Sequence, residues 1–563
     1  MNMIMKKAII LTLSAILGVF AASSCGKMLD VAPPNNITDE QISDLMVNGS
    51  AETQAKILAQ IATGIQQYFN VWAIPNVGTG ALAPSTYCMQ GIEWMRGLQG
   101  NDIAIGRDAN TNGLCGKAFY EGTFNFRLSN ESTNKAHWYV NCHIINKANF
   151  ILSYMTKEMA AQKATYANAR AAALMVRGYG YMCLMEEYTP AYGKIADVNA
   201  EKSGLPIYEE YSPGQTPVAP STAKQTWDFI KADLKEAVEL TKAYGITTGW
   251  SNLEDLDWGL ANFLYARACL LSEDWSECIN ACNNIVNSKK YSFIKEENWG
   301  GHNTGASWSA ADVEVLPETN AFTALIVNPE CILGFNVKSS YNPHSESAIA
   351  AHHTRLANPF GTYAASTCAR IDDRLYDKIS ADDFRKDGWY PAEIVNFKYL
   401  DQTPATVASY CAMKFGATYG LSESDGKTHT TKDAAVGIND FCKFRYSEVV
   451  LMLAEAYARN GNDGQAKATL NTLLAARTRT GATTLTCDNY PSMNGLSALQ
   501  MVQLQYRIEM WGENGREYYN NKRWGINVDR SGSSVHVQRS YTLDANTMVC
   551  DIIEEETQNN PNW

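Results

Sequence analysis

The sequence predicts a mainly α-helical fold, in which a scaffold of tetratricopeptide-like helical repeats carries a large, irregular, loop-rich insertion. Two observations lead to this prediction. Apolar residues in several segments recur at the spacing of one helix face, and some of these segments pair across short turns. The middle of the chain, from about residue 289 to 440, keeps no helical period and is rich in Gly, Ser, Thr, Asn and aromatics. Long irregular segments of this kind usually carry binding surfaces.

The clearest hairpin runs from Arg445 to Arg479. Its two helices flank the stretch Asn460–Gly464, where Gly and Asn tolerate the left-handed backbone that ends a helix. Small residues such as Ala454 should let the two helices approach closely. The apolar stripes fall on Val449, Met452, Leu453, Ala456 and Tyr457 in the first helix and on Ala466, Leu470, Leu473 and Leu474 in the second.

A second copy of this pattern lies upstream, because Ala266, Ala268, Cys278, Cys282, Ile285 and Val286 occupy the matching positions around a turn at Ser272–Trp275. Two weaker pairs join residues 135–155 to 164–188, and residues 223–244 to 256–271. Unrelated amphipathic helices are the alternative for these pairs. We expect helical repeats at about 135–288 and 441–525, a variable ligand-facing region at about 289–440, and an N-terminal loop region at about 71–130.

The N-terminus reads as a secretory signal over residues 1–24. Lys6 and Lys7 precede an apolar run that is too short to span a membrane comfortably. Small residues then lead directly to Cys25, as in a bacterial lipobox, which implies cleavage before Cys25 and its lipidation. A lipidated tether over residues 25–36 and a single domain over residues 37–563 should follow. No other apolar run approaches the ~20 residues of a membrane helix, so we expect membrane attachment through the lipid alone.

Composition excludes some partners. The formal net charge is −12, with no basic run, and phosphate neutralisation needs clustered Lys and Arg, so we expect no nucleic-acid partner. Of fourteen cysteines, thirteen remain after Cys25, an odd number without regular spacing. We expect mostly free, buried thiols, and a metal shared by Cys278 and Cys282 is disfavoured because no further ligand stands close by.

Signatures of an enzyme are missing from the sequence, which lacks the common metalloprotease, serine-hydrolase and P-loop motifs. The acid pairs Asp372–Asp373 and Asp382–Asp383 are interpreted as solvated loops rather than a glycosidase couple. His352–His353 is interpreted as a surface pair. Ser422–Gly426 has the composition of a calcium loop without EF-hand spacing. We therefore predict no enzymatic activity, no catalytic residue, no cofactor and no metal, with a structural Ca²⁺ as the open alternative.

Several further segments are weak signals alone but are informative in their order and spacing. They are Trp138, Tyr139, Ile144, Asn146–Asn149 and Leu152; Ala169–Tyr188 with Leu205–Ile207; Asn328–Ile332; Arg445–Val449; Gly515–Arg516 with Lys522–Gly525; and Glu555–Trp563. Together with the lipobox, they resemble the SusD/RagB family of outer-membrane nutrient-uptake lipoproteins of Bacteroidetes over essentially the whole chain. Two departures are Asn520–Asn521, where the family usually has Asp-Leu, and the extra residue Asn514.

The resemblance implies a lipid-anchored outer-membrane protein, facing the cell surface, that captures an oligosaccharide or polysaccharide and delivers it to a SusC-like TonB-dependent transporter. The alternative is a RagB-like uptake lipoprotein that binds peptides, which would rely on backbone hydrogen bonds and an extended groove. A purely structural assembly factor built on the repeats is a third, less favoured hypothesis.

A sugar offers C–H faces to aromatic rings and hydroxyls to planar donors and acceptors. The resemblance implies that ligand contacts come from the N-terminal loop region and the start of the variable region, without naming residues. From the residue types there, we predict a ligand site formed by Trp72, Trp94, Asn101, Asp102, Arg107, Trp299, Trp308 and Tyr341. Packing is the alternative for each tryptophan, and it is our prediction for Trp138, Trp275 and Trp524.

Overall fold

The computed structural model describes residues 89–105, 126–211, 216–249, 252–300, 324–335, 369–397, 405–415 and 440–563, together with residues 214 and 320–322 and a few positions between 44 and 69. The chain separates into two compact units, residues 1–63 and 64–563. The described positions of the first unit, between 44 and 57, are mostly helical. Every element below belongs to the second unit. Cys25, the tether, His352–His353 and Ser422–Gly426 lie outside the described residues.

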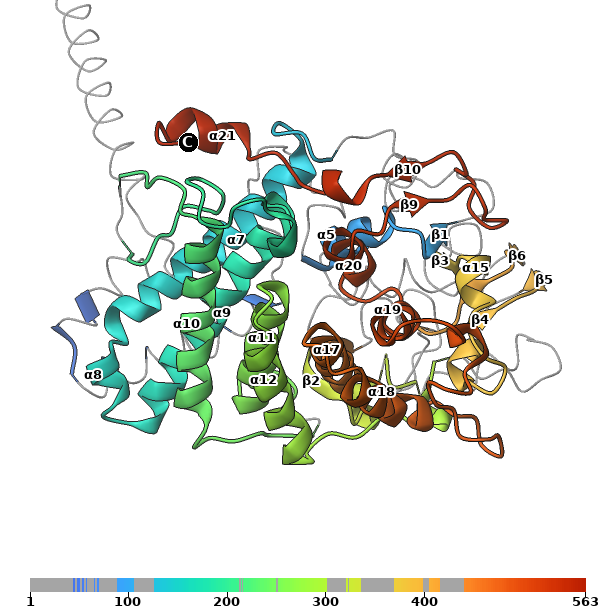
Figure 1. The fold of residues 1–563 in the computed structure, drawn as a ribbon. Coiled ribbons are helices and arrows are strands. Elements are labelled where there is room, and N and C mark those ends of the chain that lie inside the picture. Colours follow the sequence, from blue (N-terminus) through green and yellow to red (C-terminus); the bar gives the residue numbers. More distant parts are fainter. Residues whose placement is uncertain are drawn as a thin grey trace, which may run out of the picture. The chain divides into compact units, whose positions relative to one another are not determined.

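Eight long helices of the described chain pack one against the next in sequence order (Figure 1). This order confirms the predicted mainly helical fold and the hairpins at 445–479 and 258–288. It also shows that α12 packs against α17, so the two sets of repeats join directly although the irregular region separates them in sequence. The helices are α7 (Ser132–Tyr154), α9 (Ala164–Tyr188), α10 (Ala223–Thr241), α11 (Trp258–Leu271), α12 (Trp275–Ser288), α17 (Tyr446–Arg459), α18 (Asp463–Ala476) and α19 (Ala498–Glu509).

Local sequence explains where these helices begin. Thr222 and Ser497 form capping boxes with the glutamine three residues on, which satisfies backbone donors at the first turns of α10 and α19. Asn462 caps α18 by accepting a hydrogen bond from the Gln465 amide. The predicted stripe of α17 is buried except for the half-exposed Tyr457, and Ala454 is fully buried where a tight helix crossing was expected.

Shorter helices complete the described part of the second unit: α5 (Met89–Gly97), α8 (Lys157–Ala160), α15 (Asp373–Tyr376), α20 (Arg516–Trp524) and α21 (Glu554–Asn559). Short 3₁₀ turns lie at η2 (Tyr192–Lys194), η4 (Glu296–Asn298), η5 (Leu325–Val327), η6 (Phe384–Gly388), η7 (Pro491–Met493) and η8 (Ala545–Thr547).

The turn before α20 explains the extra residue in that motif. Asn514 and Gly515 have φ angles of 52° and 60°, a left-handed backbone that Asn and Gly tolerate best. The Asn514 amide donates to the Lys443 carbonyl oxygen at 2.7 Å. A Cβ atom on Gly515 would lie 2.7 Å from the carbonyl oxygen of Glu93, so a glycine is needed where α20 approaches α5.

The strands are short and antiparallel. A four-stranded sheet has the order β1 (Ile103–Ile105), β3 (Ala369–Ile371), β7 (Cys411–Ala412), β4 (Trp389–Tyr390). The remaining described strands form pairs: β2 (Cys331–Phe335) with β8 (Phe441–Arg445), β5 (Ile394–Phe397) with β6 (Ala405–Val407), and β9 (Val528–Asp529) with β10 (Thr542–Leu543). Of these ten described strands, β2 to β7 lie in the irregular region between residues 289 and 440, and β1, β8, β9 and β10 lie outside it.

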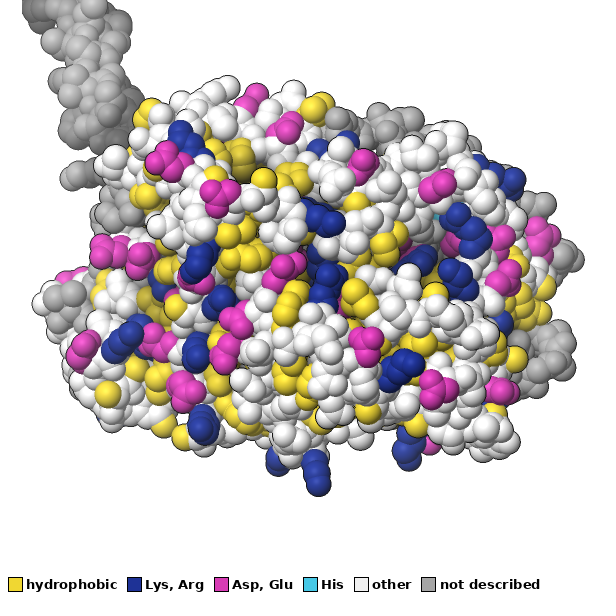
Figure 2. All heavy atoms as spheres, in the orientation of Figure 1, with side chains coloured by type: hydrophobic (Ala, Val, Ile, Leu, Met, Phe, Trp, Pro, Cys, Tyr) yellow, Lys and Arg dark blue, Asp and Glu magenta, His cyan; other side chains and the backbone are white. Residues whose placement is uncertain are grey.

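Ten cysteines fall within the described residues and all are free; eight of them are buried. Within the same residues, no helix has the length and apolarity to cross a membrane. On the face of the molecule shown in Figure 2, basic and acidic side chains are mixed over the helices.

Candidate binding site

Four of the eight predicted ligand residues lie in the described chain. Trp94 belongs to α5, Asn101 and Asp102 directly precede β1, and Trp299 follows η4. The other four, Trp72, Arg107, Trp308 and Tyr341, lie outside the described residues. The structure brings Trp94 and Asp102 to one small cavity and places Trp299 in a separate aromatic cluster.

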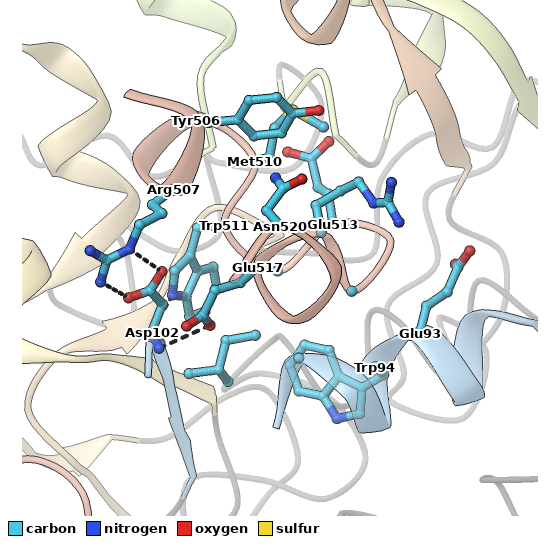
Figure 3. A pocket seen from close by; sticks show the side chains of 15 residues that line it. Glu93, Trp94, Asp102, Tyr506, Arg507, Met510, Trp511, Glu513, Glu517 and Asn520 are labelled. Carbon is cyan, nitrogen blue, oxygen red and sulfur yellow. Dashed lines mark hydrogen bonds and ion pairs between the residues drawn. The ribbon is translucent and has the colours of Figure 1, made fainter. Parts of the chain in front are cut away.

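The cavity lies between α5, α19 and α20 (Figure 3). Its volume is about 20 Å³, enough for a water molecule and far too small for a sugar ring. Trp94 is 3% exposed and lines it. We predicted Trp94 to be an exposed platform, and this is wrong: the apolar face of α5 turns the indole inward against the C-terminal helices.

Asp102 is held on the opposite side of the same cavity. Both of its carboxylate oxygens accept hydrogen bonds from the Arg507 guanidinium, at 2.9 Å from Nε and at 2.5 Å from Nη2 (Figure 3). Its carbonyl oxygen accepts from the Trp511 indole at 2.8 Å, and its amide donates to a Glu517 oxygen at 3.0 Å. With every polar atom engaged, Asp102 joins β1 to α19 and α20 and does not offer its carboxylate to a ligand.

Glu517 is the unusual acid of this cluster. Desolvation and the neighbouring Asp102 carboxylate raise its pKa to about 8, although Arg507 and the amides of Asn101 and Asp102 oppose that rise. Two carboxyl groups face one guanidinium here, so a proton on Glu517 balances the charge at neutral pH.

Asn101 is also used in packing. Its side-chain amide donates to the Asn527 carbonyl oxygen at 3.2 Å, and its side-chain oxygen accepts from the Asp529 amide at 2.8 Å. These bonds tie the chain before β1 to β9. The predicted role of Asn101 and Asp102 as free ligand contacts is therefore wrong, because both side chains are buried and bonded within the protein.

Trp299 is 1% exposed and packs in an aromatic cluster around Lys414, so its predicted role as an open platform is wrong as well. Its ring meets Phe322 edge-on at 4.9 Å between centroids. The Lys414 ammonium lies 5.6, 4.9 and 5.2 Å from the ring centroids of Trp299, Phe322 and Phe415. Burial, only partly offset by Glu513, lowers the pKa of Lys414 to about 8.

All three donors of Lys414 are used. The ammonium donates to the carbonyl oxygens of Glu509 and Trp511, at 2.8 and 3.0 Å, and to the Glu513 carboxylate at 2.6 Å. Aromatic rings on one side and these acceptors on the other fix the chain at Lys414. The cluster is a rigid base rather than an open site.

A buried ion cluster lies next to this base. Arg445 contacts Glu330, Glu509 and Glu513 at 2.9, 2.6 and 2.7 Å. Arg477 contacts Glu330 and Glu509 at 2.6 and 2.8 Å. Although burial alone raises the pKa of the Glu330 and Glu509 carboxyls, Arg477 and Arg445 outweigh it and hold both pKa values below the usual range.

Asp383 extends this cluster. Arg385 donates to Asp383 at 2.6 Å and to Glu509 at 2.9 Å, and both of its partners are fully buried. Asp372 is also buried and pairs with Arg374 at 2.8 Å. We interpreted the two acid pairs as solvated loops, which is wrong for Asp372 and Asp383: both carboxylates are internal and neutralised by arginine.

Sequence reasoning missed the ion cluster entirely. The one available signal was a set of charges inside apolar stretches, such as Arg445 in the run from Phe441 to Ala456. A charge placed there must be paired when it is buried. The motifs Asn328–Ile332 and Arg445–Val449 meet at this point, since Glu330 accepts from both Arg445 and the Ser447 hydroxyl.

Arg107, Trp308 and Tyr341 lie outside the described residues, but the described residues that flank their segments are packed in the protein. Ile105 pairs with Ala369 in the sheet, and Phe335 pairs with Phe441. Asn320 donates to the Lys414 carbonyl oxygen at 3.0 Å. A Cβ on Gly300 would lie 1.8 Å from that same oxygen. Gly300 and Asn320 therefore both pack against Lys414.

The two ladders and Lys414 belong to one packed region. Phe415 stacks on Trp511 at 6.4 Å, and the Trp511 indole donates to Asp102, directly before β1. The chain on both sides of Trp308, and on both sides of Tyr341, therefore lies on a common base, formed by β1, β3, β2, β8 and the aromatic cluster around Lys414. Arg107 follows β1 of this base, but the chain resumes at Phe126, which packs on Tyr518 and Arg96.

Comparison with known families gives two matches. The family model described as "SusD family" matches residues 384–563, and the one described as "Starch-binding associating with outer membrane" matches residues 104–244. Together they span more than half of the chain. No curated protein matches the chain.

Solved structures with a similar fold cover nearly the whole chain. A SusD-like carbohydrate-binding protein from Bacteroides vulgatus is 16% identical, with 90% of this chain and 97% of that chain covered, at a TM-score of 0.64. A SusD superfamily protein from Bacteroides thetaiotaomicron is also 16% identical, with 90% of this chain and 98% of that chain covered, at a TM-score of 0.64. Surface glycan-binding protein A from the same species, solved in complex with laminarihexaose, is 15% identical, with 89% of this chain and 97% of that chain covered, at a TM-score of 0.60. At these identities the likeness is one of fold.

Proposed function

We propose that this chain, which belongs to the SusD/RagB family, binds oligosaccharides at the outer membrane and delivers them to a partner TonB-dependent transporter. The observation that carries the proposal is the pair of family matches, one of which is described as starch-binding and associated with the outer membrane. The fold shared with a glycan-binding protein solved with laminarihexaose supports it. Capture is by binding alone, without catalysis.

The ligand residues that we propose are Trp72, Arg107, Trp308 and Tyr341. Trp308 and Tyr341 are supported by the flanking residues, which lie on the common base on both sides of each segment. Arg107 is supported on one side only, because it follows β1. A rigid base suits such a role, because segments that bind a ligand lose less freedom when their ends are already fixed. The base itself is neutralised and packed, so its own side chains are not offered as contacts.

Attachment to the membrane is proposed through lipid on Cys25. The lipobox at residues 22–25 supports this anchor. A lipid chain adds about 0.8 kcal/mol per buried CH₂ to membrane binding, so a multiply acylated cysteine would hold the protein at a bilayer surface.

Direct binding to a panel of glycans and peptides tests the function. Replacing Trp308 or Trp72 by Ala should weaken glycan binding by roughly 1–3 kcal/mol and leave the melting temperature nearly unchanged. Trp275→Ala is the matched control, because this half-exposed indole begins α12 on the helical scaffold. Its glycan affinity should equal that of the unaltered protein.

Salt dependence separates glycans from peptides. A neutral glycan held by stacking and hydrogen bonds has little charge to screen, so its affinity should not change with ionic strength. Basic peptides on an acidic protein should bind more weakly as salt rises. Salt-sensitive peptide binding without binding to any glycan would reject our proposal and support the RagB-like alternative.

A further inference from the structure

A second cavity, far larger than the first, opens on the helical side of the molecule. Its volume is about 400 Å³, within the range of small-molecule sites. It lies between α7, α9, the segment Leu205–Glu210 and α21. None of these elements belongs to the common base of the proposed glycan site. The described residues that line it are Trp138, Tyr139, Cys142, Ile145, Asn146, Asn149, Tyr181, Leu184, Leu205, Pro206, Tyr208, Glu210 and Glu556.

The aromatic walls of this helical-side pocket are held in place. The Trp138 ring packs edge-on against Tyr188, with 4.9 Å between ring centroids. The Tyr181 hydroxyl accepts a hydrogen bond from the Tyr208 amide at 2.7 Å, and the Tyr208 hydroxyl accepts from the Val218 amide at 3.3 Å. Trp138 and Tyr181 are 5% and 2% exposed and support the wall from within. The half-buried rings of Tyr139 and Tyr208 form the surface that can meet the C–H face of a sugar or a cation.

The polar lining divides into engaged and available groups. The Asn149 amide is fully used, since it donates to the Tyr208 carbonyl oxygen at 2.8 Å and accepts from Arg177 at 2.9 Å. In contrast, the exposed Asn146 amide and the Tyr139 hydroxyl have no hydrogen-bond partner among the described residues. These two groups are free to bind ligand hydroxyls.

The charge of the lining is negative. Glu554 and Glu555, on the same helix as Glu556, both pair with the single Lys135 ammonium, at 2.7 and 2.6 Å. Glu556 instead accepts from two neutral donors, the Trp563 indole and the Asn560 amide, each at 2.9 Å. Glu210 forms no ion pair with a described residue, and no Lys, Arg or His is among the described lining residues.

The thiol in the lining is not a reactive group. Burial and the nearby Glu556 carboxylate raise the pKa of Cys142, so it stays a neutral thiol at physiological pH. The helical-side pocket therefore combines rigid rings, two free hydrogen-bonding groups and two uncompensated carboxylates.

We propose that the helical-side pocket is a second, separate binding site for a short saccharide that carries a protonated amino group. The Tyr208 ring would stack on a sugar face, Asn146 and Tyr139 would bind hydroxyls, and Glu210 and Glu556 would accept hydrogen bonds from the ammonium. The two carboxylates oppose uronic, sulfated and phosphorylated sugars, because like charges would be brought together. A neutral sugar would leave both carboxylates unpaired.

Three oligosaccharides of equal length that differ at one substituent test this inference: an oligomer of glucosamine, of N-acetylglucosamine and of glucose. Titration calorimetry at a pH where the amines are protonated should show at least ten-fold tighter binding of the glucosamine oligomer at this site. Glu210→Gln should lower that affinity about two- to five-fold, as expected for a partly exposed ion pair. Adding Glu556→Gln should lower it further, and higher salt should weaken it.

Glu209→Gln is the matched control, because it removes the same charge one residue away from a side chain that does not line the pocket. It should leave the affinity unchanged. Equal binding of the three oligomers, or equal effects of the Glu209 and Glu210 substitutions, would overturn the inference. Trp308→Ala should not change glucosamine-oligomer binding at this site, so loss of the proposed glycan site and loss of the helical-side pocket give distinguishable results.

Discussion

Arg445→Met should destabilise the protein severely, because Arg445 is the cation that joins the buried ion cluster. Its side chain is 1% exposed and contacts three carboxylates, those of Glu330, Glu509 and Glu513, at 2.6–2.9 Å. Methionine fills much of the volume but supplies no charge. Breaking a buried ion pair from one side costs about 3–5 kcal/mol, since the partner carboxylates remain desolvated.

The cations that remain near these carboxylates determine how large the loss of stability is within this range. Arg477 still contacts Glu330 and Glu509, and Lys414 still contacts Glu513, so no carboxylate is left wholly unpaired. We therefore expect a loss near the lower end, about 3 kcal/mol, at neutral pH. Below the ordinary pKa of glutamate the loss should shrink, because the unpaired charge can then be removed by protonation.

Urea unfolding followed by circular dichroism measures this loss. The control is Arg459→Met, at the end of the helix that Arg445 precedes. Arg459 is partly exposed, lies over the Trp275 ring and forms one ion pair among the described residues, with Glu455, which keeps its contact with Arg523. Its loss should cost less than about 1 kcal/mol. If both variants unfold at the same urea concentration, the cluster contributes no more than a surface pair and our reasoning about buried charge fails.

Three further predictions concern the anchor, the helical scaffold and pH. Cys25→Ala should give a folded protein that no longer incorporates labelled fatty acid; continued labelling would contradict the lipobox. Ala454→Trp should lower the stability by about 1–3 kcal/mol or more, because Ala454 is fully buried where helices approach, and an unchanged melting temperature would show that this face is open. Glu517 has a pKa of about 8 in the folded protein, above the ordinary value of 4.5, so the folded state retains a proton that the unfolded state loses. Its contribution to stability is therefore fully present below pH 4.5 and is lost as the pH rises through 8, and Glu517→Gln should flatten that part of the pH profile of thermal unfolding; an unchanged slope would argue against the assignment.

The helical scaffold was predictable because its signal is local. Periodic apolar residues within each helix and turn residues between helices determine a hairpin without reference to the rest of the chain. The hairpin of α17 and α18 shows this well, since its stripe is buried as expected apart from Tyr457. Helix ends followed the caps, as at Asn462.

The side on which an aromatic residue lies was not predictable in the loop regions. Trp94 and Trp299 have neighbours that come from distant parts of the sequence, and no periodic pattern reports those neighbours. The same holds for polar residues, because the partner of Asp102 is Arg507, which lies 405 residues further along the chain. A tryptophan or an aspartate among glycines therefore looks the same whether it is a platform or a packing residue.

The acid pairs show a related limit. Charged residues on an apparently irregular stretch are usually solvated, yet Asp383 is fully buried because Arg385 folds back on it and Tyr490 donates to it at 2.9 Å. The arginine two residues on was visible in the sequence. What the sequence did not show was that the whole Asp383–Arg385 turn would be covered by α19.

The segments that resemble the SusD/RagB family have a physical role that explains why the resemblance identifies a fold more securely than a ligand. Glu330, Arg445 and Ser447 meet inside the protein, and Gly515 allows α20 to approach α5. These residues hold the common base in place. Binding residues are commonly carried on loops, which vary more in sequence than the elements that they connect. The proposed roles of Trp72, Arg107, Trp308 and Tyr341 must therefore be tested by direct binding measurements, and not by further comparison of the scaffold.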